Sequence, residues 1–291
     1  MSLRHIVSAL LIGCTAVPAC AQDAQSLIAK NLEARGGAAA LAAIKSVTFE
    51  GRTIFPGDFE VTYKETRART DGGGADRVDF GVQGLDIIQA YDGHGDGWKV
   101  NPLQGRKDAE KMSADEARAL ADAALVEGPL LAARGDGSRI DYLGRDDFDG
   151  TLAYKLKVTQ KDGDEFTYWL DPDTFLEIKV EETRRIRGAE ETTETELGDY
   201  ERVAGVHYPM SVESWTQGQP NQRQRTIIAS GTANTPLAAD FFSEPRGNPP
   251  PARAIAGQPD VANTKNGSVP PSKPAATKAP PVKPGRPGKG E

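Results

Sequence analysis

Residues 90–131 read AYDGHGDGWKVNPLQGRKDAEKMSADEARALADAALVEGPLL and set a helical pattern among strand patterns. A strand, a Gly/Asp turn and a second strand with Trp98 come first, and a loop and a helix follow. The sequence on either side alternates as β-structure does. Because an amphipathic helix must bury its apolar face, we expect this helix to cover one face of the sheet. The prediction is a curved antiparallel sheet whose helical cover encloses apolar space.

The helix of this stretch is predicted to begin after Ser113. Ser113 and Glu116 have the spacing of a capping box, in which each side chain bonds a backbone N–H of the other. Gly128 and Pro129 end this helix and start a short second one. Small residues on the inner face would let the helix lie close to the sheet, while Met112 and the larger leucines would be movable apolar contacts. The residues expected on that face are Ala117, Leu120, Ala121, Ala124 and Leu125.

The flanking sequence alternates apolar and polar residues, which is typical of an antiparallel sheet with one solvated face. Turn residues recur roughly every 8 to 12 residues. Before the strands, residues 23–45 predict a helix in two pieces, interrupted at Gly36 and Gly37. The run of charged residues over 181–196 is interpreted as a solvated outer face of the sheet with cross-strand ion pairs.

Residues 1–21 have the pattern of a secretory signal peptide. An apolar run over residues 6–12 precedes Ala19-Cys20-Ala21, which matches an A-x-A cleavage site. Cleavage there removes Cys14 and Cys20, the only two cysteines of the chain. We therefore expect an exported protein without disulfides or thiolate metal sites. In a competing interpretation, Cys14 ends a bacterial lipoprotein box and its acylation anchors the protein.

Residues 245–291 differ from the rest in composition, because they hold twelve of the twenty prolines and few large apolar side chains. Such a segment buries too little surface to offset its ordering entropy, so we predict a disordered tail. Its eight Lys/Arg against Asp260 and Glu291 give a net charge of +6. The whole chain has a net charge of −7, and subtracting the +6 of this tail and the +1 of Arg4 leaves a net charge of −14. That charge belongs to residues 22–244, the predicted folded domain. An acidic domain of this kind is not expected to bind nucleic acid, while contact of the tail with an anionic surface stays open.

The strongest candidate for chemistry is the Asp92-Gly-His94-Gly-Asp96 turn. It begins like a calcium loop, but Leu103 stands where the acidic ligand of the twelfth position belongs. His94 and His207 have no triad or HExxH context, and no GxSxG, P-loop or dinucleotide fingerprint is present. We expect a glycine-rich hairpin turn here and a protein that is not an enzyme, with no metal and no cofactor.

The order of several motifs resembles the outer-membrane lipoprotein-sorting (LolA-like) family. The resemblance rests on the end of the N-terminal helix at residues 42–46 (AAIKS) and on the hairpin from Tyr91-Asp92-Gly93 to Asn101-Pro102 with the helix after it. It also rests on residues 170–179 (LDPDTFLEIK) and 198–209 (GDYERVAGVHYP), and it covers about residues 24–243. It implies a half-barrel of about eleven antiparallel strands with helices on the concave side. Members are periplasmic and carry the acyl chains of lipoproteins or other lipids, and the same fold serves a regulator that senses mislocalised lipoproteins.

From these arguments we predict a monomeric carrier that holds lipid or lipoprotein acyl chains in a cavity between sheet and helices. The alternative is a sensor or interaction domain of the same fold with a filled core, and envelope membrane proteins are possible partners of either. The residues predicted to line the cavity, from the facing of their side chains, are Phe49, Phe59, Val61, Tyr63, Trp98, Met112, Leu120, Leu125, Tyr154 and Tyr168.

Overall fold

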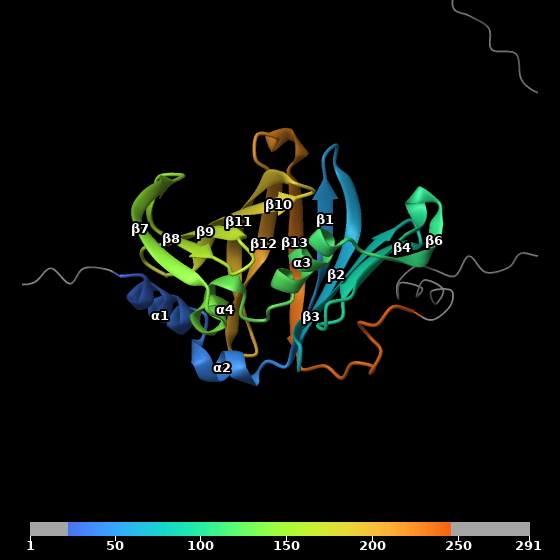
Figure 1. The fold of residues 1–291 in the computed structure, drawn as a ribbon, viewed down its shortest axis with the longest axis horizontal. Helices are drawn as coiled ribbons and strands as arrows, with labels where there is room; N and C mark the ends of the chain where they lie inside the picture. Colours follow the sequence, from blue (N-terminus) through green and yellow to red (C-terminus); the bar gives the residue numbers. More distant parts are fainter. Residues whose placement is uncertain (1–22, 246–291) are drawn as a thin grey trace, which may run out of the picture. The chain divides into compact units, whose positions relative to one another are not determined.

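A computed structural model describes residues 23–245 of the chain (Figure 1). The predicted signal peptide and nearly all of the predicted tail lie outside the described residues, so those segment boundaries stay predictions. In the part that is described, no helix is long and apolar enough to cross a membrane.

The described elements are six helical segments and 13 strands. The helices are α1 (Ala24–Ala34), α2 (Gly37–Ala43), η1 (Pro102–Gln104), α3 (Ala114–Ala123), α4 (Pro129–Asp136) and η2 (Pro220–Gln222). The strands are β1 (Ser46–Phe55), β2 (Phe59–Thr70), β3 (Gly73–Val82), β4 (Leu85–Tyr91), β5 (Gly97–Asn101), β6 (Arg106–Lys111), β7 (Arg139–Phe148), β8 (Thr151–Thr159), β9 (Glu165–Leu170), β10 (Glu177–Ile186), β11 (Ala189–Val203), β12 (Val206–Thr216) and β13 (Gln224–Ala233).

All of these strands belong to one antiparallel sheet, in the order β6-β5-β4-β3-β2-β1-β13-β12-β11-β10-β9-β8-β7. Pairing of β1 with β13 joins an N-terminal wing (β1–β6) to a C-terminal wing (β7–β13). The edges β6 and β7 are not paired with each other, so the sheet is not closed into a barrel. Helix α3 lies in front of the middle of the sheet, between the two wings, and α4 lies in front of the C-terminal wing (Figure 1). The predicted half-barrel with a helical cover is confirmed.

The sheet has 13 strands where about eleven were expected. The strands with the weakest pattern are the two edges, β6 and β7. Strand β6 reads RKDAEK and has no apolar face, as is common for an edge strand that must not pair with another chain. Strand β7 is interrupted between Tyr142 and Gly144 by an irregularity in its register, which breaks its alternation.

The helix boundaries follow the capping signals of the sequence. Helix α1 begins where the Asp23 carboxylate accepts a 2.6 Å hydrogen bond from the Ser26 N–H. Helix α3 has the predicted capping box, since Glu116 N–H donates to the Ser113 hydroxyl and Ser113 N–H donates to the Glu116 carboxylate. Helix α4 begins at Pro129, as predicted, and ends at Asp136.

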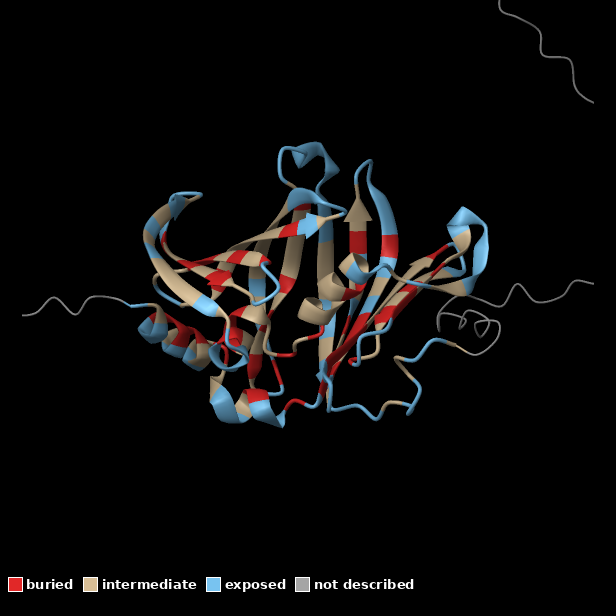
Figure 2. Cartoon of the chain, in the orientation of Figure 1, coloured by how far each residue is buried: buried red, intermediate tan, exposed pale blue. Residues whose placement is uncertain are grey.

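The main core lies between helices α1, α2 and α4 and the concave face of the C-terminal wing. Side chains from the helices pack directly against the sheet, and the buried residues of this core appear in red in Figure 2. The largest fully buried members are Leu27, Ile28, Ile44, Leu130, Leu156, Leu170 and Tyr208. A second, smaller cluster of Ile88, Ala90, Trp98 and Val100 belongs to the N-terminal wing.

Candidate ligand-binding site

Helix α3 lies close against the concave face of the N-terminal wing because glycines face it. A Cβ added to Gly74 on β3 would lie 2.5 Å from the Ala124 carbonyl oxygen, at the end of α3. A Cβ added to Gly97 on β5 would lie 3.1 Å from the Ala117 Cβ. Small residues on both elements therefore set the spacing, and the contact buries few large apolar side chains. This agrees with the predicted small-residue face of the helix.

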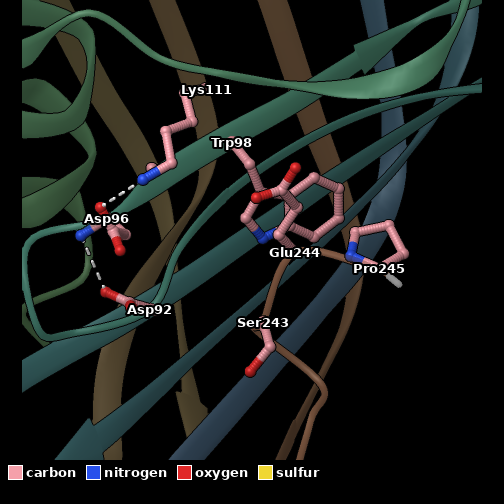
Figure 3. A pocket seen from close by; sticks show the side chains of 8 residues that line it. Asp92, Asp96, Trp98, Lys111, Ser243, Glu244 and Pro245 are labelled. Carbon is pink, nitrogen blue, oxygen red and sulfur yellow. Dashed lines mark hydrogen bonds and ion pairs between the residues drawn. The ribbon is translucent and has the colours of Figure 1, made fainter. Parts of the chain in front are cut away.

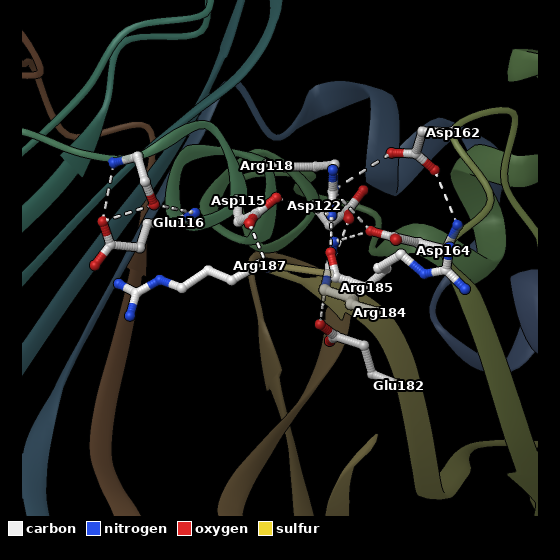
Figure 4. Close-up of polar contacts among 11 residues, drawn as sticks. Asp115, Glu116, Arg118, Asp122, Asp162, Asp164, Glu182, Arg184, Arg185 and Arg187 are labelled. Atoms are coloured by element: carbon white, nitrogen blue, oxygen red, sulfur yellow. Dashed lines mark hydrogen bonds and ion pairs between the residues drawn. The ribbon is translucent and has the colours of Figure 1, made fainter. Parts of the chain in front are cut away.

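On its other side, α3 is held to the C-terminal wing by charges. An ionic cluster of Asp115, Arg118, Asp122, Asp164 and Arg184 joins α3 to β10 and to the β8–β9 turn (Figure 4). Arg184 donates to Asp122 at 2.7 Å and to Asp164 at 2.5 Å, and Arg118 donates to Asp164 at 3.0 Å. The helix thus spans the opening between the wings.

The charges of this cluster are fixed by their neighbours. Burial alone would lower the pKa of the Arg184 guanidinium, but Glu182 and Asp122 raise it, so Arg184 stays protonated. At the start of the helix, the Lys99 ammonium and the Ser113 N–H lower the pKa of the Glu116 carboxyl from 4.5 to about 2. Both ends of α3 are therefore tied by groups that are ionised at neutral pH.

Beneath the end of α3, the concave face of β2 and β3 carries a polar group of side chains. The Glu65 carboxylate accepts a 2.5 Å bond from the Tyr63 hydroxyl and two bonds, of 2.9 and 3.0 Å, from the Arg67 guanidinium. Asp76, paired with Arg67 across the strands, is fully buried, and neither of its carboxylate oxygens has a hydrogen-bond partner among the described residues. Burial, and then Glu65, raises the pKa of Asp76 well above 3.8.

Beyond α3, toward the hairpin ends of the N-terminal wing, the concave face becomes aromatic. We call Phe55, Phe59, Tyr63 and Phe80 the aromatic strip. Ring centroids lie 6.3 Å apart for Phe55 and Phe59, 6.2 Å for Phe55 and Phe80, and 5.9 Å for Tyr63 and Phe80. Phe59 is 46% exposed and the other three are half-buried, so this part of the concave face offers apolar surface to a ligand.

A hollow of about 430 Å³ lies between α3 and strands β4–β6. Two predicted site residues, Met112 and Leu120, face it, together with Gln89, Lys99, Asn101, Gln104, Glu110, Glu116 and Ala119. A second hollow, of about 420 Å³, lies beside the ionic cluster and is lined mostly by charged residues, including Arg118, Asp164 and Arg184. Both therefore suit polar groups more than an acyl chain while α3 stays in place.

The structure separates the predicted site residues into three groups. Phe49, Val61 and Tyr168 are buried on the concave face, and Tyr63 and Tyr154 are half-buried there against the main core. Phe59, Met112, Leu120 and Leu125 retain exposed surface around α3 and at the β1–β2 hairpin. Trp98 forms the third group.

The predicted position of Trp98 is wrong, because it lies on the convex face. Trp98 pairs with Ala90, Ala90 with Arg77, and Arg77 with Thr66, which puts Trp98 on the face opposite Tyr63 and Phe49. Its indole Nε1 donates a 2.7 Å bond to the Phe242 carbonyl, so residues after β13 cross the convex face here. They border a hollow of about 500 Å³ with Asp92, Asp96 and Lys111 (Figure 3).

Asp92 and Asp96, the acids of the glycine-rich turn, are engaged locally. The Asp92 carboxylate accepts bonds from the N–H groups of His94 and Asp96, at 2.8 and 3.1 Å, and Asp96 pairs with Lys111 at 3.3 Å. These contacts are those of the predicted hairpin turn between β4 and β5.

Several residues of the site were missed from the sequence. Arg184 was interpreted as part of a solvated outer face, but its side chain is buried and points toward α3. Phe55 and Phe80 follow the alternation of apolar and polar residues in their strands, so the sequence could have placed them on the same face as Phe59 and Tyr63. Nothing in the sequence indicated that Glu65 and Asp76 are buried, because a charged residue in a strand is normally assigned to the solvated face of the sheet.

Comparisons with known proteins identify solved structures of similar fold but no relative of similar sequence. No family model matches the chain, and no curated protein matches it. Among solved structures, an outer membrane lipoprotein-sorting protein domain from Vibrio parahaemolyticus is 15% identical, with a TM-score of 0.50, over 74% of this chain and 94% of that one. A LolA superfamily protein from Nitrosomonas europaea is 15% identical, with a TM-score of 0.52, over 77% of this chain and 98% of that one.

The chain has the LolA-like fold. A DUF1329 family protein from Desulfovibrio piger also matches, at 12% identity and a TM-score of 0.51, over 76% of this chain and 97% of that one. At such identities the likeness concerns the LolA-like sheet and its helices alone.

Proposed function

We propose that this protein binds an apolar chain, the acyl chain of a lipoprotein or of another lipid, and carries it through the periplasm without covalent chemistry. The observation that supports this most is the way α3 is held over the concave face. Small residues and ion pairs fix it, rather than interlocked large apolar side chains. Such a contact can separate without exposing much apolar surface to water.

In this proposal the ligand enters when α3 moves away from the sheet. Its apolar chain then lies along the aromatic strip and over Val61, which lies between Phe59 and Tyr63 on β2. Burial of apolar surface at about 25 cal/mol per Å² drives binding. The comparisons support the proposal at the level of the fold, since one match is named as a lipoprotein-sorting domain.

The uptake of a long-chain fluorescent fatty acid by the purified protein tests this function. The variant Phe55→Ala/Phe80→Ala should lose most of the uptake, because it removes two rings of the aromatic strip. The matched control is Ile54→Ala, a half-buried residue of β1 on the convex face. No uptake by the wild-type protein, or equal loss in the control, would count against a carrier. Native mass spectrometry after gentle purification provides an independent measurement of bound lipid.

A second function, a sensor or interaction domain, is favoured by a different observation. Helices α1, α2 and α4 pack directly on the C-terminal wing, and the side chains of that core are fully buried. A domain of this kind would bind a protein partner on its surface and take up no fatty acid. The uptake experiment therefore distinguishes the two functions.

A further inference from the structure

We infer that a proton on Asp76 controls whether helix α3 lies on the sheet. The helix packs on the N-terminal wing while the Asp76 carboxyl is neutral, and it lifts away when that carboxyl loses its proton. Asp76 is fully buried, and neither of its carboxylate oxygens has a hydrogen-bond partner among the described residues. Buried polar groups nearly always have such a partner, so a carboxyl without one requires an explanation. This regulation rests on the movement of α3 in the proposed function, but it requires no ligand.

Helix α3 contacts the sheet on two sides of Asp76. Asp76 pairs with Tyr91 and Tyr91 pairs with Gly97, so these three residues form one row across β3, β4 and β5. At the β5 end of the row, a Cβ added to Gly97 would lie 3.1 Å from the Ala117 Cβ. Gly74, two residues before Asp76 on the same face of β3, is in similarly close contact with the end of α3. The helix therefore lies over Asp76 and keeps water from its carboxyl.

The charges on β2 do not compensate an ionised Asp76. Arg67 lies opposite Asp76 and favours its ionised form, but its guanidinium donates two hydrogen bonds, of 2.9 and 3.0 Å, to Glu65. Glu65 is buried on the same face, and its carboxylate opposes a second negative charge beside it. The next cation along β2, Arg69, pairs with Glu127 in the loop after α3 at 2.7 Å. An anion at Asp76 would therefore be poorly compensated while the helix is in place.

The titratable groups on the other elements around Asp76 are neutral or already paired. On α3, Asp122 accepts a 2.7 Å bond from Arg184. On β3 itself, Asp79 lies on the opposite face of the strand, in an ion pair of 2.8 Å. On β4, burial raises the pKa of the Tyr91 hydroxyl above 10, so this group carries no charge at neutral pH. Asp76 is therefore the unmatched acid of the contact between α3 and the sheet.

The protonation of Asp76 and the position of α3 are linked. An ionised carboxylate without a partner is costly to bury, so Asp76 keeps its proton while the helix covers it. Burial, and then the charge of Glu65, raises the pKa of Asp76 well above 3.8. Water reaches the carboxyl when the helix lifts, and the pKa then falls back toward 3.8. The covered state binds the proton more tightly, so acid favours the covered state and rising pH favours the lifted one.

Thiol labelling of α3 at different pH values tests the inference. Residues 22–291, the predicted mature chain, contain no cysteine. Ala117 is buried against the sheet, so the thiol of Ala117→Cys reacts with iodoacetamide only when the helix lifts. Each rate is divided by the rate of the same protein unfolded in urea at the same pH, which removes the pH dependence of the thiol. From about pH 5 to about pH 8 we expect this relative rate to rise about tenfold or more, and to stay constant when Asp76→Asn is added.

Two further variants are the controls. Asp79→Asn, added to Ala117→Cys, removes a carboxylate from the other face of β3 and should keep the pH dependence. Ala153→Cys reports unfolding of the whole domain, because Ala153 is fully buried on β8 in the C-terminal wing. Lifting of a single helix requires less free energy than global unfolding, so labelling at Ala153→Cys should be slower by about tenfold or more.

A relative rate at Ala117→Cys that does not change with pH would overturn the inference, and this result does not depend on the folding of Asp76→Asn. A rise that is the same with and without Asp76→Asn, or an equal loss of the rise with Asp79→Asn, would overturn it as well. So would equal rates at Ala117→Cys and Ala153→Cys, since α3 would then lift only with the whole domain. No ligand is present, so absence of fatty-acid uptake would refute the carrier function and leave the inference standing.

Discussion

Arg184 on β10 and Asp122 on α3 form a 2.7 Å ion pair in which the arginine side chain is only 4% exposed. The same guanidinium also bonds Asp164, whose side chain is equally buried. Through this arginine, the C-terminal wing holds a helix that packs by its other side on the N-terminal wing. The position of α3 over the concave face thus depends on both wings at once.

Replacement of Arg184 should be strongly destabilising. The variant Arg184→Met leaves Asp164 buried without its closest cation, and breaking a buried pair in this way costs about 3 kcal/mol or more. Lys64→Met is the control, because Lys64 pairs with Glu50 at the surface and such pairs contribute about 1 kcal/mol or less. Urea unfolding of both variants measures the difference, and similar losses for the two would refute the role given to Arg184.

Removal of the Asp76 charge should make stability less dependent on pH. An acid whose pKa is raised by folding binds its proton more tightly in the folded state, so stability falls as the pH rises from 3.8 through the folded pKa. Asp76→Asn removes this loss. We expect the variant to be more stable than the wild-type protein at about pH 8, with a difference that closes toward pH 4. The pH dependence of urea unfolding checks this, and a difference that stays constant or grows on acidification would contradict it.

Two leucines of β8 should differ sharply in their contribution to stability. Leu156 is fully buried in the main core, whereas Leu152 is 51% exposed. Leu156→Ala should lower the free energy of unfolding by about 2–5 kcal/mol, and Leu152→Ala by about 0.5 kcal/mol or less. Thermal and urea unfolding measure both. Equal effects would show that the core does not reach Leu156 as described.

Much of the fold could be predicted because its signals are local. The capping box at Ser113 and Glu116, the helix break at Gly36 and the hairpin after Tyr91 each depend on residues close in sequence. Alternation within a strand shows which side chains share a face of that strand, and for β2 it placed Val61 and Tyr63 together on the concave side.

The site was harder to predict because it depends on contacts between distant strands. Alternation cannot say which of two faces is concave, and Trp98 was assigned to the wrong one for that reason. Residues 235–245 cross the convex face and bury Trp98, although β5 and the Phe242 carbonyl are far apart in sequence. Arg184 illustrates the same limit, since its partner Asp122 lies on α3, in another part of the chain.

The central claim is that ligand uptake requires α3 to move away from the sheet, and a disulfide across that contact tests it most directly. Residues 22–291 contain no cysteine. A Cβ at position 97 would lie 3.1 Å from the Ala117 Cβ, so the strand and the helix must separate by a few tenths of an ångström to reach the range of about 3.5–4.5 Å found in disulfides. For Gly97→Cys/Ala117→Cys, we predict that the oxidised protein takes up no fluorescent fatty acid and that reduction restores the uptake. Equal uptake by the oxidised and reduced forms would contradict the claim.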